Sequence, residues 1–157
     1  MKKIFLIIFA ACLFIVGCGE NSQASVEGKE AAPVKNSVTI QINGKNFSAT
    51  LKDNLSAKKF VEMFPLEVEA VELNGNEKYF YLEKNLPSNS VAVGQIHAGD
   101  LMLFGSNCVV IFYKNFSTGY SYTRLGKIDD ADDLEKILGA GNVRVNFETD
   151  YKESSEI

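Results

Sequence analysis

The sequence predicts a mostly β domain, folded as a small closed β-barrel with two short helices. Several short segments alternate apolar and polar side chains, which is typical of strands buried on one face. The turn-forming pairs Asn43-Gly44 and Asn74-Gly75 separate some of these segments. Because so many short strands would leave exposed edges in an open sheet, we expect the sheet to close and the helices to cover the barrel ends.

The first two strands are predicted to form a hairpin. Residues 38–42 and residues 47–51 each alternate apolar with polar side chains, and Asn43-Gly44 lies between them. Asparagine followed by glycine adopts the positive φ angles of a type I′ turn, whose twist matches that of paired strands. We therefore expect a tight turn at this position.

The next strand covers residues 66–73 and contains an irregularity. Its alternation is interrupted where Ala70 and Val71 stand side by side as apolar neighbours. This change of phase predicts a bulge or bend near Ala70. After the second Asn-Gly pair, residues 79–82 are predicted to form another short strand.

A short helix is predicted between an N-cap at Asn54 or Ser56 and a stop at Pro65. Its apolar residues recur at helical spacing, so they form one face that can pack on the barrel. They are Ala57, Phe60, Val61 and Phe64.

A second short helix is predicted to begin at Asp129 or Asp130 and to end at Gly139. Acidic residues favour the positive end of a helix dipole, and glycine is common where a helix stops. The apolar face of this helix consists of Leu134, Ile137 and Leu138.

Four more strands are predicted in the second half of the chain. They cover residues 101–104, 108–113, 120–125 and 143–147. The second of these does not alternate cleanly, so we expect it to be covered on both faces, by the barrel interior and by a helix. Cys108 begins this strand and is interpreted as a small buried apolar side chain, not a nucleophile.

The first 18 residues have the form of a bacterial lipoprotein leader. Lys2 and Lys3 precede an apolar run of 13 residues, 4–16, which is followed by Gly17 and Cys18. The run is too short to span a bilayer, which takes about 20 apolar residues. Cleavage before Cys18 would leave a thiol that carries the lipid, so we expect Cys18 to be the anchor.

This leader divides the chain into four expected parts. They are a signal peptide over residues 1–17, a lipidated flexible tether over 18–36, a barrel domain over 37–148 and a polar tail over 149–157. The mature protein would be attached to the bacterial cell membrane or outer membrane through acyl chains on Cys18 and would face the extracytoplasmic side.

Composition excludes several classes of partner and chemistry. Without the leader, 14 basic and 20 acidic side chains remain, so the formal charge changes from −4 to −6 and no basic surface for nucleic acid is expected. His97 is the only histidine, and no metal-binding spacing of Cys or His occurs. We therefore expect no metal, no cofactor and no catalytic constellation.

Four strings of residues resemble those of the bacterial cyclophilin-like domain family. They are residues 73–79, 99–105, 112–114 and 120–126, and the resemblance covers about residues 37–148. It implies a small cyclophilin-type barrel, often found behind a lipoprotein signal. Catalytic cyclophilins are peptidyl-prolyl isomerases with Phe-His-Arg and Phe-Met-x-Gln-Gly-Gly strings. Neither string occurs here, so no residue is carried over as catalytic.

Aromatic residues and one arginine are the candidate ligand site. Tyr120, Tyr122 and Arg124 would share one face of a strand, because strand side chains repeat with period two. Two phenols and a guanidinium could bind an extended peptide or a carboxylate, although the same pattern also fits a solvated sheet face. Tyr79, Tyr113 and Phe116 either extend this patch or belong to the core or rim.

The sequence thus predicts a lipid-anchored envelope protein with a non-enzymatic module that binds a peptide or small ligand. Two alternatives remain open at this point. The first is a weak peptidyl-prolyl isomerase acting on exported proteins, and the second is an envelope scaffold without a ligand.

Overall fold

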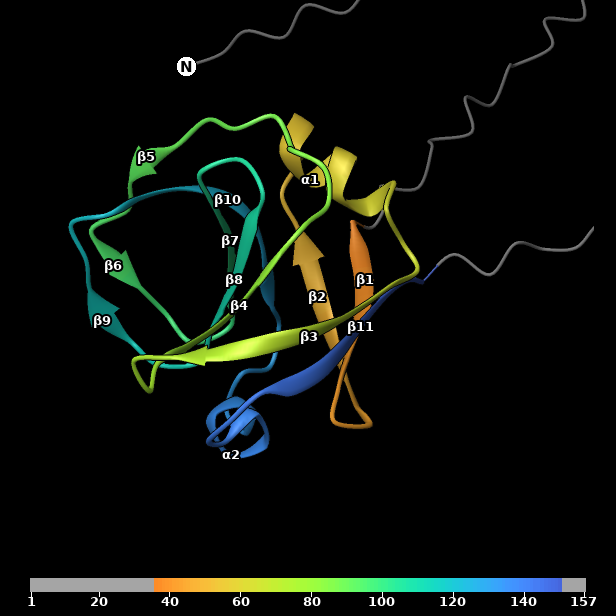
Figure 1. The fold of residues 1–157 in the computed structure, drawn as a ribbon, viewed down its shortest axis with the longest axis vertical. Coiled ribbons are helices and arrows are strands. Elements are labelled where there is room, and N and C mark those ends of the chain that lie inside the picture. Colours follow the sequence, from red (N-terminus) through yellow and green to blue (C-terminus); the bar gives the residue numbers. More distant parts are fainter. Residues whose placement is uncertain (1–35, 151–157) are drawn as a thin grey trace, which may run out of the picture. The chain divides into compact units, whose positions relative to one another are not determined.

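A computed structural model describes residues 36–150, and these residues form a closed antiparallel β-barrel of eight strands with two short helices (Figure 1). The barrel strands follow the order β2-β1-β11-β3-β4-β8-β7-β10, and β10 pairs back with β2. Their bounds are β1 (Ser37–Ile42), β2 (Lys45–Leu51), β3 (Leu66–Leu73), β4 (Glu77–Tyr81), β7 (Asp100–Phe104), β8 (Cys108–Phe112), β10 (Ser121–Ile128) and β11 (Val143–Thr149).

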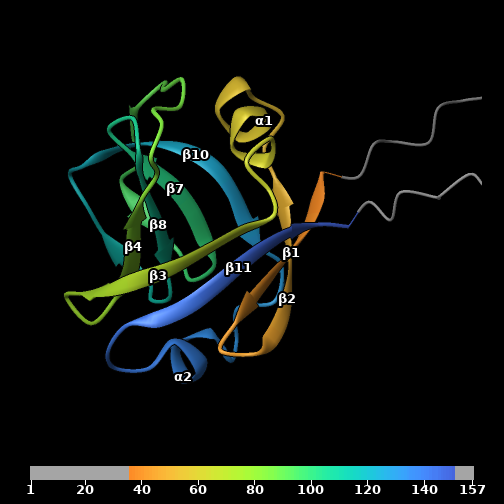
Figure 2. The same cartoon turned by 45° about the vertical axis from the view of Figure 1, so that its right-hand side comes forward.

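Two helices and three very short strands complete the described part of the chain. The helices α1 (Leu55–Val61) and α2 (Leu134–Leu138) lie on opposite sides of the strands (Figures 1 and 2). The short strand β5 (Val91–Ala92) pairs with β10, while β6 (Gln95–Ile96) and β9 (Phe116–Ser117) pair with each other. Within residues 36–150, no helix has the length and apolar character that crossing a membrane requires.

The first hairpin is confirmed. Strands β1 and β2 are joined by Asn43 and Gly44, whose φ angles are 48° and 83°. Both angles are positive, as a type I′ turn requires. The turn therefore sets the register of the two strands from local sequence alone.

A glycine allows the barrel to close. Gly126 of β10 pairs with Leu51 of β2, and a Cβ atom built at Gly126 would lie 2.7 Å from the Thr50 carbonyl oxygen. Real Cβ atoms do not come this close, so any side chain here would push the two strands apart. The last pairing of the barrel thus depends on the absence of a side chain.

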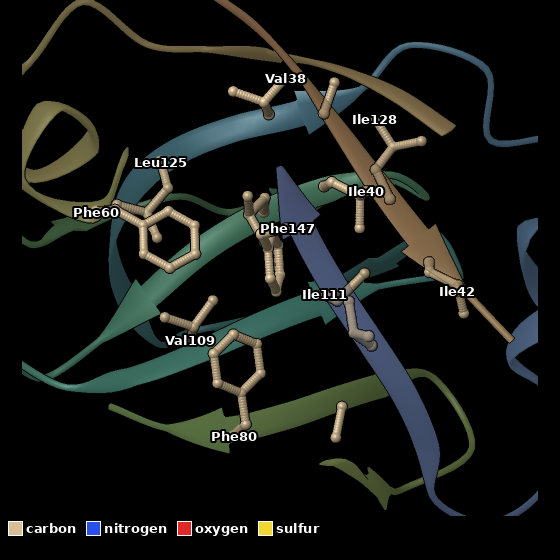
Figure 3. Packing of buried hydrophobic residues seen from close by; sticks show 14 of the residues in the cluster. Val38, Ile40, Ile42, Phe60, Phe80, Val109, Ile111, Leu125, Ile128 and Phe147 are labelled. Atoms are coloured by element: carbon tan, nitrogen blue, oxygen red, sulfur yellow. The ribbon is translucent and has the colours of Figure 1, made fainter. Parts of the chain in front are cut away.

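The barrel interior holds the main hydrophobic core (Figure 3). Residues of both helices belong to this core. The Phe60 ring of α1 lies 5.3 Å from the Phe147 ring of β11, measured between centroids, and Phe80 of β4 lies 5.6 Å from Phe147. Leu134 and Leu138 of α2 belong to the same core. The apolar faces predicted for the two helices therefore pack against the barrel.

The expected bulge near Ala70 is wrong. Strand β3 keeps its alternation through Glu72, pairing in regular register with β11 up to Ala70 and with β4 from Val71. Glu72 points into the structure, where Lys78 pairs with it. The apparent change of phase arises because a glutamate occupies an inward position while Val71 is exposed.

The second helix begins later than predicted. Its first residue is Leu134, and Asp133 is the N-cap residue, whereas Asp129 still bonds to β2. There the Thr50 hydroxyl donates to Asp129 Oδ1 at 2.8 Å. The helix ends before Gly139, as predicted.

Strand β8 is buried on both faces, but no helix covers its outer face. Val109 and Ile111 point into the barrel core. On the other side, Val110 and Phe112 belong to a second apolar cluster, to which the β6–β9 ribbon contributes Ile96 and Phe116. The covering element is therefore a pair of two-residue strands.

Candidate functional site: an aromatic groove on the outer face of the barrel

The outer face of β4 begins the candidate site. Glu77, Tyr79 and Tyr81 point outward, while Lys78 and Phe80 between them are buried inside the barrel. This alternation follows from the period of two in a strand. One short strand therefore presents a carboxyl group and two phenols on a single face.

Neighbouring strands extend this face sideways. In the antiparallel register, Tyr81 pairs with Cys108 of β8, and Cys108 pairs with Phe104 of β7. The Phe104 ring lies 5.6 Å from the ring of Tyr122 on β10. Four strands thus contribute side chains to one continuous, largely aromatic surface.

The surface is hollowed into an open groove of about 340 Å³. This volume lies at the lower end of the range typical of small-molecule sites. The lining residues are Leu73, Asn74, Glu77, Tyr79, Tyr81, Phe104, Cys108, Val110, Tyr120 and Tyr122.

Several rings in the groove are strongly exposed. Tyr81 is 66% exposed, Tyr120 is 65% exposed and Phe104 is 47% exposed. The Phe104 and Tyr120 rings meet edge to face at 6.0 Å, and Tyr79 and Tyr81 do so at 5.8 Å. Exposed aromatic groups gathered in one concave region mark a binding site more often than a chance surface.

One side of the groove is packed against the second apolar cluster, to which Tyr122 belongs. Tyr122 is 6% exposed, and its ring lies edge to face on Phe112 at 5.5 Å. Phe112 in turn contacts Phe116 of β9, with 5.7 Å between ring centroids. Tyr122 is therefore held rigidly, whereas Tyr120 just before β10 is free to contact solvent or a ligand.

Glu77 is the only charged residue among those that line the groove. Its side chain is half-buried, and no cationic group among residues 36–150 forms an ion pair with it. Burial raises the pKa of Glu77, and the nearby charge of Glu72 adds to this rise. Among residues 36–150, the charged form of this carboxyl group in the groove thus has no ion-pair partner.

Two other titratable groups in the groove respond to the same surroundings. Burial raises the pKa of the Cys108 thiol, and the Glu77 charge raises it further. Burial, followed by the Glu77 charge, also raises the pKa of Tyr122 to about 12. Both groups therefore remain neutral at physiological pH, so Cys108 is not activated as a nucleophile.

Arg124 shares the outward face of β10 with Tyr122 but does not line the groove. Its guanidinium Nη1 lies 3.8 Å from Asp100 Oδ2. Asp100 also accepts a 3.0 Å hydrogen bond from the backbone N–H of His97, and His97 Nδ1 lies 3.8 Å from the same oxygen. Arg124, Asp100 and His97 therefore lie together at the turn before β7.

Tyr113 belongs to a different place, on the inner side of the sheet. Its hydroxyl donates to Glu72, with both carboxylate oxygens at 2.9 Å. Lys78, which is fully buried, bonds to the same carboxylate and donates to the carbonyl oxygens of Gly139 and Gly141 at 2.9 and 2.7 Å. We call Glu72, Lys78 and Tyr113 the Lys78 cluster.

The Lys78 cluster is a satisfied polar group inside the fold. Burial, its Glu72 hydrogen bond and the Glu72 charge raise the pKa of Tyr113 to about 12. For Glu72, burial by itself raises the pKa, but the hydrogen bonds from Lys78, Tyr113 and the Gly75 N–H together with the Lys78 charge outweigh burial and lower it. The cluster ties the chain after α2 to β4, so its role is structural.

The structure therefore brings together only part of the candidate site predicted from sequence. Tyr79, Tyr120 and Tyr122 line one groove, whereas Tyr113, Phe116 and Arg124 lie outside its lining. Whether any of them contacts a ligand stays a prediction.

Sequence reasoning missed Glu77, Tyr81 and Phe104, which also line the groove. Glu77 and Tyr81 could have been found from the period of two that places them beside Tyr79. Phe104 could not, because its position depends on pairing between distant segments.

The chain belongs to the cyclophilin-like family, whose sequence profile matches residues 40–148. The fold is similar to the solution structure of the hypothetical protein AF2241 from Archaeoglobus fulgidus. That likeness has a TM-score of 0.51 and 17% sequence identity, and it covers 76% of this chain and 98% of that one. At this identity it supports the fold alone. No curated protein matches this chain.

Proposed function

We propose that this protein is a lipid-anchored protein of the bacterial cell envelope whose cyclophilin-like barrel binds a peptide or small ligand without catalysing a reaction. One observation carries the binding proposal. Tyr81, Phe104 and Tyr120 are large aromatic side chains that stay exposed beside an open groove, although β4, β7 and β10, on or next to which they lie, bury nearly all of their other apolar residues. Leaving such area in contact with water is unfavourable, and a ligand would cover it.

The groove has side chains that could bind a ligand but few groups that could catalyse a reaction. Its polar groups are Asn74, Glu77, the Cys108 thiol and the tyrosine hydroxyls, while the Arg124 guanidinium lies beside Asp100. Catalysis of prolyl isomerisation must lower a barrier of about 18–20 kcal/mol, which calls for a donor aimed at the amide. The residues that line this groove include no arginine, the donor that catalytic cyclophilins use. This supports binding in preference to isomerisation.

A ligand screen by thermal unfolding tests the binding proposal. A ligand at about 100 times its Kd should add roughly 2.7 kcal/mol to the free energy of unfolding. We expect hits whose effect is lost in Tyr120→Ala and kept in Leu55→Ala, since Leu55 is equally exposed on α1 but lies outside the groove. If no peptide or metabolite stabilises the protein, the scaffold alternative replaces this proposal.

An isomerase assay tests the competing function. We expect no acceleration of proline isomerisation in a protease-coupled peptide assay. Acceleration that disappears in Arg124→Ala would contradict the binding-only proposal and favour the isomerase.

The lipid anchor is a separate part of the proposal. The lipoprotein box at residues 15–18 lies outside the described residues, so its support is the sequence pattern alone. We expect Cys18→Ala to abolish acyl labelling and to release the protein from the membrane fraction. Labelling that persists in Cys18→Ala would contradict the anchor.

A further inference from the structure

We propose that the aromatic groove binds a small organic ammonium ion, held by the faces of its tyrosine rings and by the Glu77 carboxylate. This inference rests on the proposed binding function and names the chemical class of the ligand. The first observation is the charge of the lining residues, among which Glu77 is the only charged side chain.

The aromatic rings supply the first attraction for a cation. Four tyrosines and one phenylalanine line the groove. The face of an aromatic ring is negative, so a cation within about 6 Å of a ring centre is attracted, most strongly when several rings share it. The edge-to-face contact of Tyr79 with Tyr81 and of Phe104 with Tyr120 turns ring faces in different directions around the groove.

The carboxylate supplies the second attraction. Glu77 is half-buried beside Cys108 and Tyr122, which are neutral, and beside Glu72, which is already paired with Lys78. An ammonium ion would provide the opposite charge that Glu77 lacks. An anionic ligand would meet uncompensated repulsion at the same place.

The floor of the groove favours a small molecule over an extended peptide. Strands β8 and β7 are paired along both edges, and β4 is paired with β8 along its whole length and with β3 over residues 77–79, so the sheet uses most of their backbone groups. A peptide that adds a strand needs a free sheet edge, which this surface lacks. The volume of about 340 Å³ suits a compact cation.

Choline and its neutral isostere 3,3-dimethylbutan-1-ol test the role of charge. They have nearly the same shape, and only choline is positively charged. By titration of the full chain, we expect choline to bind about tenfold or more tightly than the alcohol, as a cation–π contact together with a carboxylate implies. Equal binding of the two compounds, or no binding of choline, would overturn the inference.

Matched variants test which residues cause the preference for choline. Glu77→Gln should remove most of the preference for choline, whereas Glu83→Gln, an exposed glutamate just beyond β4, should leave it unchanged. Tyr120→Leu keeps apolar bulk but removes a ring face, so choline affinity should fall while binding of the alcohol changes little. Loss of preference in Glu83→Gln, or its survival in Glu77→Gln, contradicts the assigned site.

The outcomes separate this inference from the proposed function. If the alcohol or another neutral compound, such as a sugar, binds in a Tyr120-dependent way and choline does not, the groove is a binding site but not for cations. If no compound of any charge binds in a Tyr120-dependent way, the proposed function itself fails.

Discussion

Glu72 and Glu77 lie on the paired strands β3 and β4, but they face opposite sides of the sheet and have opposite surroundings. Glu72 accepts hydrogen bonds from Lys78 and Tyr113, and its pKa is lowered. Glu77 lies in the aromatic groove without a cationic partner in the part of the chain that the structure describes, and its pKa is raised. A carboxylate that is paired with groups of the same protein stabilises the fold, whereas an unpaired carboxylate in an open groove is available to a ligand.

The largest expected effect is on the inner side, at Lys78. Lys78→Met removes the charged partner of Glu72 and the donor to the carbonyl oxygens of Gly139 and Gly141, and breaking a buried pair costs about 3–5 kcal/mol. Urea unfolding should show this loss. The exposed ion pair of Lys58 is the control, and Lys58→Met should unfold close to wild type. A loss no larger than that of Lys58→Met would show that the cluster does not hold the fold.

The next effect is the pH-dependent loss in Glu72→Gln. We expect about 1–3 kcal/mol less stability at neutral pH, because the buried Lys78 loses its charged partner while the glutamine amide oxygen can still accept a hydrogen bond from it. The folded pKa of Glu72 lies below its ordinary value of 4.5, so the unfolded chain binds more protons in that range. Its contribution is complete above pH 4.5 and is lost as pH falls through the folded pKa. Urea unfolding should therefore show the wild type and variant converging in acid, and a constant gap would contradict this.

Glu77→Gln should change the free energy of unfolding in the opposite direction from Glu72→Gln and by a smaller amount. The folded state keeps the Glu77 proton to a higher pH than the unfolded chain, so this carboxyl lowers stability as pH rises above 4.5 through its folded pKa. Replacing it with an uncharged amide should raise stability slightly at neutral pH and leave it unchanged below pH 4.5. Thermal unfolding of the wild type and the variant, at neutral pH and below pH 4.5, measures this difference in stability. Destabilisation at neutral pH would mean that Glu77 has a partner within the protein.

The smallest effect on stability is expected for Tyr120→Leu. Tyr120 is 65% exposed, so its replacement should change the free energy of unfolding by no more than about 0.5 kcal/mol. Tyr122→Leu is the contrast, because the buried Tyr122 ring packs on Phe112 and its loss should be clearly larger. Equal losses in the two variants would show that Tyr120 also supports the fold.

Much of the fold could be predicted because its signals are local. The Asn43-Gly44 turn, the alternation of β1 and β2, and the Asn54 cap of α1 each depend on residues close in sequence. The strands β6 and β9 could not be found in this way. Each has only two residues, which is too short to show a period, and the two strands are held together by pairing with each other.

The candidate site was less predictable because it depends on distant partners. The period of two correctly placed Tyr122 and Arg124 on one face, but it could not tell that the Arg124 guanidinium would lie beside Asp100 and outside the lining of the groove. In the same way, the sequence predicts an interruption of the strand near Ala70, because it does not show that Glu72 points inward and pairs with Lys78. Ion pairs of this kind become visible only in three dimensions.

The most direct test of the contrast between the two regions is a map of amide chemical shifts in the full chain during titration with choline. We predict shifts on β4, on β8 and around Tyr120, with no more than slight changes at Gly139 and Gly141, whose carbonyl oxygens accept hydrogen bonds from Lys78 of the Lys78 cluster. Shifts concentrated instead at the exposed acidic residues 129–133, or no saturable shifts at all, would contradict the assignment of the groove as the binding site.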